Sequence, residues 1–388
     1  MTRVEGHPTS PVPGVSVRVP YRRGVPTRSR RIRDRLVAGL AEADTLEDTM
    51  AAAHVVLADA VRAQSGVWST VDPTTTLSTS CGLHGLLGAS RDAQAEAVRE
   101  RRLFQLEWAD DAPNTFWALG RAGRTAAGLA VDVDDPRRVQ RYAELLSPLG
   151  IRDELRILLE VDRRPWATAI LYRHEPGAFT PEDVATAAGA ADLVGAAVRR
   201  ALLRAVCDAR VVASPPGSLL VTPGGEVVTS SAAAEELLAA LAPEQVPVVL
   251  TSLAVATRME GSASVTVTGP EGVVTLHGSP AKGLDDVAVV LERPRPVELA
   301  PLIMEGLGFT ARERQVTESL LQGLSRRMIA SAVGVSEATL GDHLKQVYRK
   351  ADVTSRSELA ALLYGRYYER PRAQGVPPGP YGYFAGLS

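Results

Sequence analysis

The chain has 388 residues but only two cysteines, six histidines and three lysines. Cys81 and Cys207 lie far apart and have no zinc-ligand spacing with the histidines, which argues against a disulfide framework and the common zinc modules. No apolar run reaches the about 18 residues that a membrane-spanning helix needs, and the N-terminus lacks the apolar core of a signal peptide. We therefore expect a cytoplasmic protein with no metal site, no cofactor and no membrane contact.

Two regulatory modules are also missing from the sequence. The N-terminal region shows no strand followed by paired acids, which excludes a phospho-receiver domain. No Walker-type glycine-rich loop is present, which excludes a large ATP-binding regulator. An enzyme would need a convergent set of side chains, and the pair Cys81 and His84 without a third group is weak evidence for nucleophilic catalysis. We therefore predict that the protein is not an enzyme.

Arginine replaces lysine almost throughout the chain. Only three of the 43 basic residues are lysines, namely Lys282, Lys345 and Lys350, and all the others are arginines. Together with abundant alanine, valine and glycine, this bias is typical of a bacterial, GC-rich genome. The formal charge of the whole chain is −2, so the protein is not a generally basic DNA coat. Two of the three lysines lie within one predicted helix near the C-terminus.

Residues 310–364 carry the start and stop signals of four short helices. A serine or threonine cap precedes each helix, and two caps have a glutamate three residues later, which completes a capping box. Glycines follow the first two helices, where a left-handed residue ends a helix. The caps are Thr310, Ser325, Ser336 and Ser355, the glutamates are Glu313 and Glu358, and the glycines are Gly323 and Gly334. Short helices joined by a glycine turn predict a helix-turn-helix.

This segment resembles the C-terminal DNA-binding domain of LuxR-type transcription regulators. The resemblance depends on residues whose order and spacing agree with that family. They are Thr310, Arg312, Glu313, Gly323, Leu324, Ser325, Ile329, Ala330, Gly334, Val335, Ser336, Thr339, His343, Ser355, Arg356, Ser357, Glu358 and Leu359. It implies an all-α domain over residues 303–368 that binds double-stranded DNA. A small helical interaction bundle is the alternative.

The resemblance implies that the third helix contacts base edges in the major groove. The family usually has a basic residue two positions after Thr339, but here that position is Gly341, and Asp342 follows it. Asp342 either accepts a hydrogen bond from a cytosine amino group or lies on a solvated face. Lys345 is then the best remaining base contact. The other candidate DNA contacts, mainly to phosphates, are Thr339, Arg326, Arg327, Arg349, Lys350 and Arg356.

The charge of this segment is modest for a DNA-binding domain. Residues 307–366 contain nine Arg and Lys against six Asp and Glu, a local balance of +3. Phosphate contacts dominate affinity for DNA and weaken as the salt concentration rises. We therefore expect the chain to bind DNA as a homodimer, since two domains on one site double the number of contacts.

Residues 33–209 have the pattern of one α/β sensory domain. A helical region over residues 36–64 is followed, further on, by strands at 154–161 and 166–172 that form a hairpin with a turn at residues 163–165. Residues 179–183 then begin a long helix. This order resembles a GAF domain, and a generic antiparallel sheet with a covering helix is the alternative. Candidates to line a ligand cavity are Trp108, Phe116, Trp117 and Trp166, although aromatic residues more often form core.

The long helix carries small apolar residues at a seven-residue spacing. They are Val184, Ala191, Val198 and Ala205, with Ala188, Gly195 and Leu202 in the companion positions. Small residues allow two helices to approach closely, which predicts a parallel dimer helix that ends the sensory domain. Alternatively, the same face packs on the sheet of its own domain.

A third unit extends over residues 214–296. Its β-β-helix-β-β-β order resembles a reduced PAS domain, but no cysteine or histidine lies where a flavin or haem ligand would be convincing. Residues 1–32 predict a disordered basic arm, and nine arginines against two acids occur in residues 1–35. Residues 369–388 are rich in proline, glycine and tyrosine and predict a disordered tail.

These patterns together predict a multidomain α+β chain with a GAF-like α/β sensor, a PAS-like α/β unit and an all-α helix-turn-helix domain. We predict a dimeric, sequence-specific transcription regulator whose DNA binding is controlled by a small ligand or a protein contact at the sensor. RNA polymerase is a further candidate partner. The alternative is a signalling adaptor, in which the GAF- and PAS-like units dock a protein partner and DNA contact is weak or lost.

Overall fold

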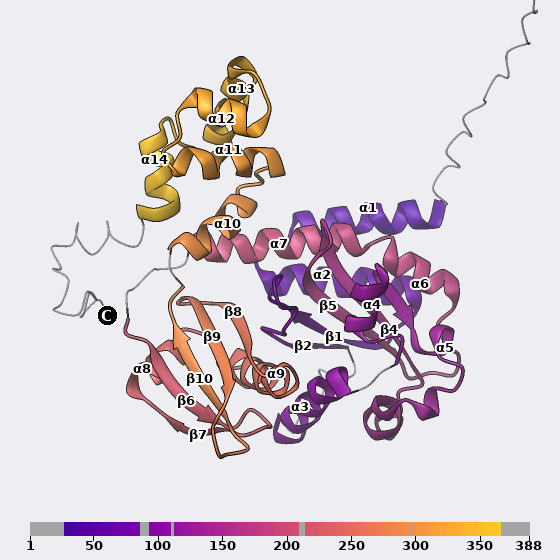
Figure 1. Cartoon of the computed structure of the whole chain (residues 1–388). Coiled ribbons are helices and arrows are strands. Elements are labelled where there is room, and N and C mark those ends of the chain that lie inside the picture. The colour runs from indigo at the N-terminus through magenta and orange to yellow at the C-terminus, as the bar shows by residue number, and fades with distance from the viewer. Residues whose placement is uncertain (1–26, 86–92, 110–111, 209–213, 295, 366–388) are drawn as a thin grey trace, which may run out of the picture.

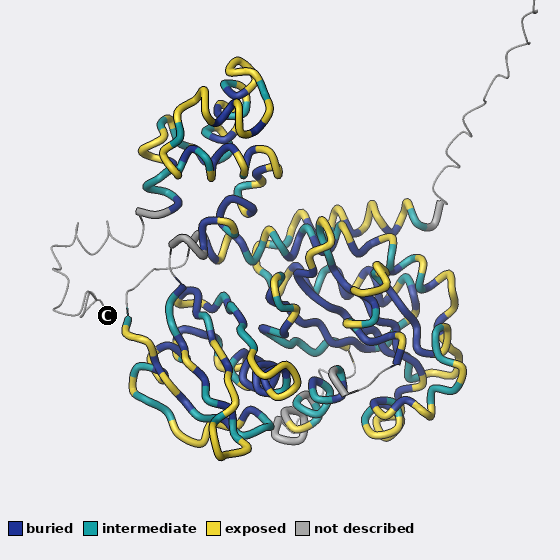
Figure 2. Tube along the Cα trace, in the orientation of Figure 1, coloured by how far each residue is buried: buried dark blue, intermediate teal, exposed yellow. Residues whose placement is uncertain are grey.

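The computed structural model describes residues 27–85, 93–109, 112–208, 214–294 and 296–365. Two antiparallel sheets with their covering helices come first, and a helical domain follows at the C-terminal end (Figure 1). Buried residues concentrate in the middle of each of these three units (Figure 2). The predicted fold class, mixed α/β units followed by an all-α domain, is confirmed.

The first sheet has five strands in the order β2-β1-β5-β4-β3. They are β1 Ser65–Thr70, β2 Gly82–Gly85, β3 Ala126–Gly128, β4 Asp153–Val161 and β5 Arg164–Arg173. The predicted hairpin joins β4 and β5, but its turn lies at Asp162 and Arg163, with φ angles of 52° and 62°, and not at residues 163–165. Two left-handed residues match the twist of the strands that they connect.

Helices cover both faces of this sheet. One face packs against α1 Thr27–Ala41, α2 Leu46–Val61, α6 Pro181–Ala188 and α7 Ala191–Asp208 and forms the main core. Over the other face lie α3 Ala93–Ala109 and α4 Phe116–Ala122, with α5 Leu129–Asp132 and the turns η2 Pro136–Arg138, η3 Tyr142–Leu146 and η4 Ser147–Leu149 between β3 and β4. The sheet is therefore the middle layer of this unit.

The helical region predicted for residues 36–64 is two helices. Thr45 begins α2 with a capping box: its Oγ1 accepts from the backbone N–H of Asp48 at 3.0 Å, and the Asp48 carboxylate accepts from the backbone N–H of Thr45 at 3.2 Å. This cap requires an extended backbone at Thr45, so α1 cannot continue through it. Residues 27–32 of the predicted disordered arm belong to α1. Residues 1–26 and the predicted tail lie outside the described part of the chain.

The structure corrects the predicted dimer helix. The helix is interrupted at Gly189, between α6 and α7. Ala191, Gly195 and Val198 of the small-residue stripe are buried, and Val184, Ala188 and Leu202 are partly buried against the same core. A Cβ atom on Gly195 would lie only 3.0 Å from the backbone nitrogen and oxygen of Glu160 in β4. The small residues therefore allow a helix to pack closely on its own sheet, which was the alternative interpretation. Ala205 is the exception, because it is exposed.

The middle unit is built on a second sheet in the order β7-β6-β10-β9-β8. Its strands are β6 Gly217–Val221, β7 Val227–Ser230, β8 Ala263–Gly269, β9 Gly272–Pro280 and β10 Val287–Glu292. Numbered within each unit, both sheets have the order second, first, fifth, fourth, third. One face is covered by α8 Ala232–Leu238 and by α9 Gln245–Glu260, which the sequence did not predict. Because α9 is buried on most sides, it lacks the polar face that reveals a surface helix.

The C-terminal domain includes a helix that the sequence also did not predict. Its helices are α10 Pro296–Gly306, α11 Ala311–Leu321, α12 Arg326–Val333, α13 Glu337–Ala351 and α14 Arg356–Ala360, followed by a last turn at Ala361–Gly365. Ile303 and Met304 of α10 share one hydrophobic core with α11 to α14, and this core extends to Val206 of α7 and Val273 of β9. The C-terminal domain is therefore packed against both preceding units.

Candidate functional site

The helices α12 and α13 form the predicted helix-turn-helix. Ser325 accepts from the backbone N–H of Met328 at 3.4 Å and begins α12, and Ser336 accepts from that of Thr339 at 3.1 Å and begins α13. Gly334 between them has a left-handed φ of 69°. The residues that cap and turn these two helices are thus as predicted from the sequence.

The predicted second capping box is only half present. Ser355 caps α14, since it accepts from the backbone N–H of Glu358 at 3.1 Å. The Glu358 carboxylate, however, accepts from the backbone N–H of Thr354 at 2.7 Å and not from that of Ser355. The two N–H groups are adjacent in the chain, and the spacing rule does not distinguish them.

One face of α13 is buried and the opposite face is open to solvent. Leu340, Leu344 and Val347 pack into the domain core. The exposed residues of this helix include Thr339, Asp342, Lys345 and Arg349, and Arg326, Arg327 and Arg356 are exposed on the neighbouring helices. In Figure 1 α13 lies at the end of the domain farthest from both sheets. The surface that the sequence assigned to DNA is accordingly not covered by the other units in the described structure.

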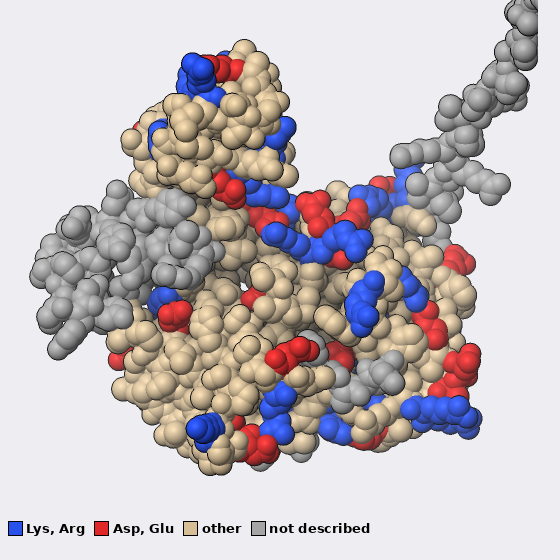
Figure 3. Space-filling model, in the orientation of Figure 1, with Lys and Arg blue, Asp and Glu red and all other residues tan. Residues whose placement is uncertain are grey.

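The charges on this face alternate in sign. Nζ of Lys345 lies 3.9 Å from Oδ1 of Asp342, and the two side chains are 81% and 79% exposed. Such an exposed pair contributes little to stability but reduces the net attraction for phosphates. Figure 3 shows a basic and an acidic group next to each other at the far end of this domain, among uncharged surface.

The structure revises the role of Lys350 as a phosphate contact. Its Nζ lies 2.6 Å from Oε2 of Glu313 and 2.8 Å from the carbonyl oxygen of Gly308. Burial alone would raise the pKa of Glu313, but hydrogen bonds from Lys350 and from the backbone of Thr310 outweigh it and hold this pKa below its usual value. Lys350 therefore connects α13 to the beginning of α11, and sequence spacing gave no sign of this partner.

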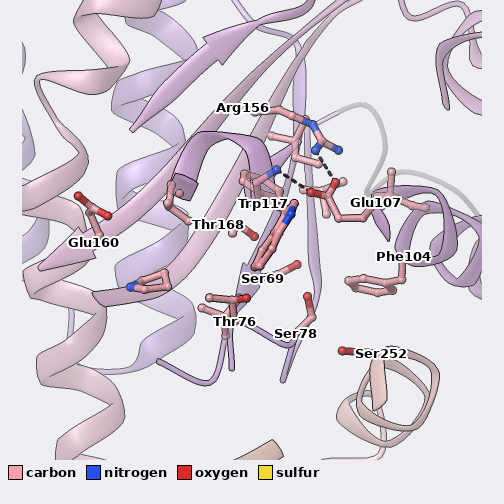
Figure 4. Close-up of a pocket in the computed structure, with 18 of the residues that line it drawn as sticks. Ser69, Thr76, Ser78, Phe104, Glu107, Trp117, Arg156, Glu160, Thr168 and Ser252 are labelled. Atoms are coloured by element: carbon pink, nitrogen blue, oxygen red, sulfur yellow. Dashed lines mark hydrogen bonds and ion pairs between the residues drawn. The ribbon is translucent and has the colours of Figure 1, made fainter. Parts of the chain in front are cut away.

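A cavity of about 300 Å³ lies between the first sheet and the helices α3 and α4. Its middle is mainly apolar. The apolar lining comprises Val67, Val71, Leu103, Phe104, Phe116, Leu158 and Ile170. In Figure 4 Glu107 and Arg156 lie at one end, and Thr76, Ser78 and Ser252 lie at the other. Since Ser252 belongs to α9, the middle unit contributes to the cavity wall.

Buried charges balance one another at the Arg156 end of the cavity. Arg156 forms ion pairs with Glu107 and, at 3.4 Å, with Glu154. Burial by itself raises the pKa of Glu154, but the guanidinium groups of Arg141 and Arg156 outweigh it and lower this pKa to about 2. Arg156 also lies over the ring of Phe116, 4.7 Å from its centroid, and its Nη2 has no hydrogen-bond partner among the described residues.

Comparison with known families identifies one domain in the N-terminal half of the chain and another in its C-terminal part. Residues 307–363 match the family of bacterial regulatory proteins, luxR family, and residues 42–198 match the GAF domain. The chain carries a GAF domain followed by a LuxR-family helix-turn-helix domain. A 75-residue stretch is 41% identical to a protein described as an HTH-type transcriptional regulator in the exeN 3′ region of Aeromonas salmonicida. That stretch covers 19% of this chain and 38% of the relative.

Two solved structures align with parts of this chain at low similarity. The GAF domain of a phosphoenolpyruvate-protein phosphotransferase from Coxiella burnetii is 13% identical, with a TM-score of 0.31, and 46% of this chain covers 96% of it. Escherichia coli SdiA is 12% identical, with a TM-score of 0.33, and 88% of this chain covers 99% of it. These TM-scores are low, so the family matches alone bear on function.

Of the four aromatic residues predicted to line a ligand cavity in the GAF domain, the structure places two at the cavity and one in the core. Phe116 and Trp117 line the cavity, and Trp117 lies at its mouth, 56% exposed. Trp166 is corrected: it is 2% exposed and packs on the opposite face of the sheet, in the core with α2 and α7. The side chain of Trp108 lies outside the described residues. Alternation along β5 would place Trp166 on the cavity face with Thr168 and Ile170. A register shift between Leu159 and Glu160 of β4 interrupts the alternation, so Trp166 lies in the same core as Ala167.

The connection between β1 and β2 joins the cavity to the middle unit. Thr76 and Ser78 line the cavity, whereas Leu77 between them is buried in the core of the middle unit. Nearby, Oδ2 of Asp72 accepts from the backbone N–H of Thr266 in β8 at 2.7 Å. One short segment therefore contacts both the cavity and the second sheet.

A second junction connects the GAF domain to the helix-turn-helix domain through α10. The Glu305 carboxylate is buried and lies 3.4 Å from Arg164 of β5 and 3.6 Å from Arg199 of α7. Gly306 follows it, and a Cβ atom there would lie 2.8 Å from the Cβ atom of Leu203. The close approach requires a glycine, so α10 is held tightly on α7.

No helix among the described residues is long and apolar enough to cross a membrane. The described residues also contain no group of three or more His, Cys, Asp or Glu side chains suited to a metal ion. His84, which neighbours Cys81 in the sequence, stacks on His54 with 4.9 Å between ring centroids.

Proposed function

We propose that this protein is a dimeric, cytoplasmic, non-enzymatic transcription regulator that binds specific DNA sequences through α13. The observation that carries this proposal is the open face of α13 on a LuxR-family domain. Thr339, Lys345 and Arg349 lie on that face and are the proposed contacts to DNA. RNA polymerase is a further proposed partner.

We propose that signals change the orientation of the helix-turn-helix domain and do not act by uncovering the exposed face of α13. The open face of α13 is already exposed. The helix α10 is fixed to α7 through Glu305, and it also packs in the core of the C-terminal domain. A change in the GAF domain that moves α7 would turn the attached DNA-binding domain. In a dimer, such a rotation changes the spacing of the two recognition helices, and affinity for a two-part site depends on that spacing.

The cavity suggests the chemical class of the signal. We propose a compact, uncharged and largely apolar molecule with one hydrogen-bond acceptor. The apolar walls and the ring of Phe116 favour its body, and Nη2 of Arg156 is available to donate to its acceptor. Arg156 and Arg141 are already balanced by Glu107 and Glu154, so a charged ligand would leave an uncompensated buried charge. A protein contact at the GAF domain remains the competing input.

The proposal is tested by selecting genomic DNA fragments with the purified full-length protein. Enrichment of an inverted repeat is expected, together with a dimer in sedimentation experiments. Absence of any enriched sequence would favour the adaptor interpretation. A parallel thermal-shift screen of small apolar molecules tests the sensor, since a ligand at 100 times its dissociation constant adds about 2.7 kcal/mol to the free energy of unfolding.

A further inference from the structure

Gly341 lies in the interior of α13, but neither packing nor backbone geometry requires a glycine there. The nearest heavy atom to a Cβ built on Gly341 is Nη2 of Arg326, at an ordinary 3.9 Å. Gly341 is not among the residues with positive φ. Glycine in a helix interior costs about 1 kcal/mol relative to alanine, and nothing else within the domain explains this glycine.

Arg326 is the neighbour that uses this open space. It occupies the first position of α12, is exposed, and forms no ion pair or hydrogen bond with the residues that the structure describes. A long side chain at position 341 would compete with its guanidinium group. Gly341 therefore leaves space for the guanidinium group of Arg326, on α12, to lie against α13.

The charges around Arg326 leave it as an unneutralised cation at this place. Asp342 and Lys345 partly compensate each other at 3.9 Å. Arg349 is bonded to Gln346 at 2.7 Å and lies eight residues beyond Gly341, about 12 Å along the helix at 1.5 Å per residue. A ligand that approaches Gly341 thus meets Arg326 of α12 before it meets Arg349 of α13.

We propose that Arg326 crosses Gly341 into the major groove and donates two hydrogen bonds to a guanine. This inference rests on the proposed DNA-binding function. The planar guanidinium fork matches the O6 and N7 acceptors of guanine, which form the commonest specific arginine contact. Arg326 is then a specificity-determining residue supplied by α12, in addition to those on α13.

The test uses the full-length protein on its selected site and on every single-base-pair variant of that site, each at several salt concentrations. Arg326→Ala is expected to weaken binding to the selected site roughly 5- to 150-fold, the range of one bidentate base contact. It should remove the preference at one G·C pair and leave affinity for unrelated DNA and the salt dependence unchanged. Arg327→Ala is the matched control, because Arg327 is also exposed but points about 100° further round α12.

A second variant keeps the test independent of folding. Gly341→Lys combined with Arg326→Ala is expected to regain part of the lost affinity, because a cation again lies at this place on α13. Thermal unfolding of Arg326→Ala should match the wild type, since the side chain is exposed and has no ion pair or hydrogen bond with the described residues.

Two results would overturn the inference. The first is an equal loss on all sequences with a salt slope reduced by about 1, which identifies a phosphate contact. The second is unchanged binding by Arg326→Ala. In both cases the wild type still selects a site, and the proposed function stands. If the wild type selects no site, the proposed function itself fails.

Discussion

Nζ of Lys350 and Oε2 of Glu313 lie 2.6 Å apart and tie the last turn of α13 to the first turn of α11. Lys350→Met should therefore lower the free energy of unfolding by about 1.5–3 kcal/mol, the contribution of a hydrogen bond to a charged group. The measurement is urea denaturation followed by circular dichroism. Arg349→Met is the control: it should preserve stability and reduce the salt slope of DNA binding by about 1 if Arg349 contacts a phosphate. Equal stability losses in both variants would contradict this division of roles.

Lys345 and Asp342 should have opposite effects on DNA binding. Lys345→Ala is expected to cost about 1–3 kcal/mol on the selected site and to relax specificity, if Lys345 contacts a base. Asp342→Asn should strengthen binding to unrelated DNA, because it removes a negative charge from the face that approaches the phosphates. Fluorescence anisotropy on both DNAs measures the effects. Loss on every sequence for Lys345→Ala would make it a phosphate contact instead.

Gly195 and Gly341 test which glycines are required by packing. A methyl group on Gly195 would meet the backbone of Glu160 at 3.0 Å, whereas one on Gly341 has space. Gly195→Ala should destabilise the protein by about 1–3 kcal/mol through overpacking, and Gly341→Ala should stabilise it by up to about 1 kcal/mol. Chemical denaturation compares the two. If Gly195→Ala is neutral, α7 does not pack on β4 as described.

Leu77 should control how the GAF domain and the middle unit unfold together. It is buried in the core of the middle unit, although it belongs to the connection between two GAF strands. Leu77→Ala creates a cavity at this interface, for which core truncations cost about 2–5 kcal/mol. We expect calorimetry to show a second, separate transition for the middle unit. Leu284→Ala, at an exposed position of the middle unit, should leave the wild-type profile unchanged.

His54 should make the GAF domain sensitive to acid. Burial, together with the nearby His84, lowers the pKa of His54 from 6.5 to about 4. The unfolded state therefore takes up a proton before the folded state does, and stability is lost as the pH falls from about 6.5 to about 4. The loss is on the order of 3 kcal/mol. His54→Asn, which keeps an acceptor for Nε1–H of Trp68, should flatten the fall in melting temperature across that window, whereas the exposed His277→Asn should not.

Some elements were predictable because their signals are local. The caps at Thr310, Ser325 and Ser336 bond to a backbone group three residues later, so a short stretch of sequence contains the whole interaction. The hairpin of β4 and β5 was equally clear, because continuous strand-forming runs flank a short turn. The helix α9 was missed because burial on most sides removes the apolar–polar alternation on which such predictions depend. In α10 the interior Pro301 argued against a helix.

The sequence by itself determined the helix-turn-helix, the order of the units and which residues of α13 face outward. It did so because caps, turns and helical periodicity depend on neighbours within one or two turns. Only the tertiary structure decided that the small-residue stripe packs on β4, that Trp166 is core, that Lys350 binds Glu313 and that Arg326 lies beside Gly341. Each of these depends on which elements, separate in the chain, pack against one another, and spacing along one element does not contain that information.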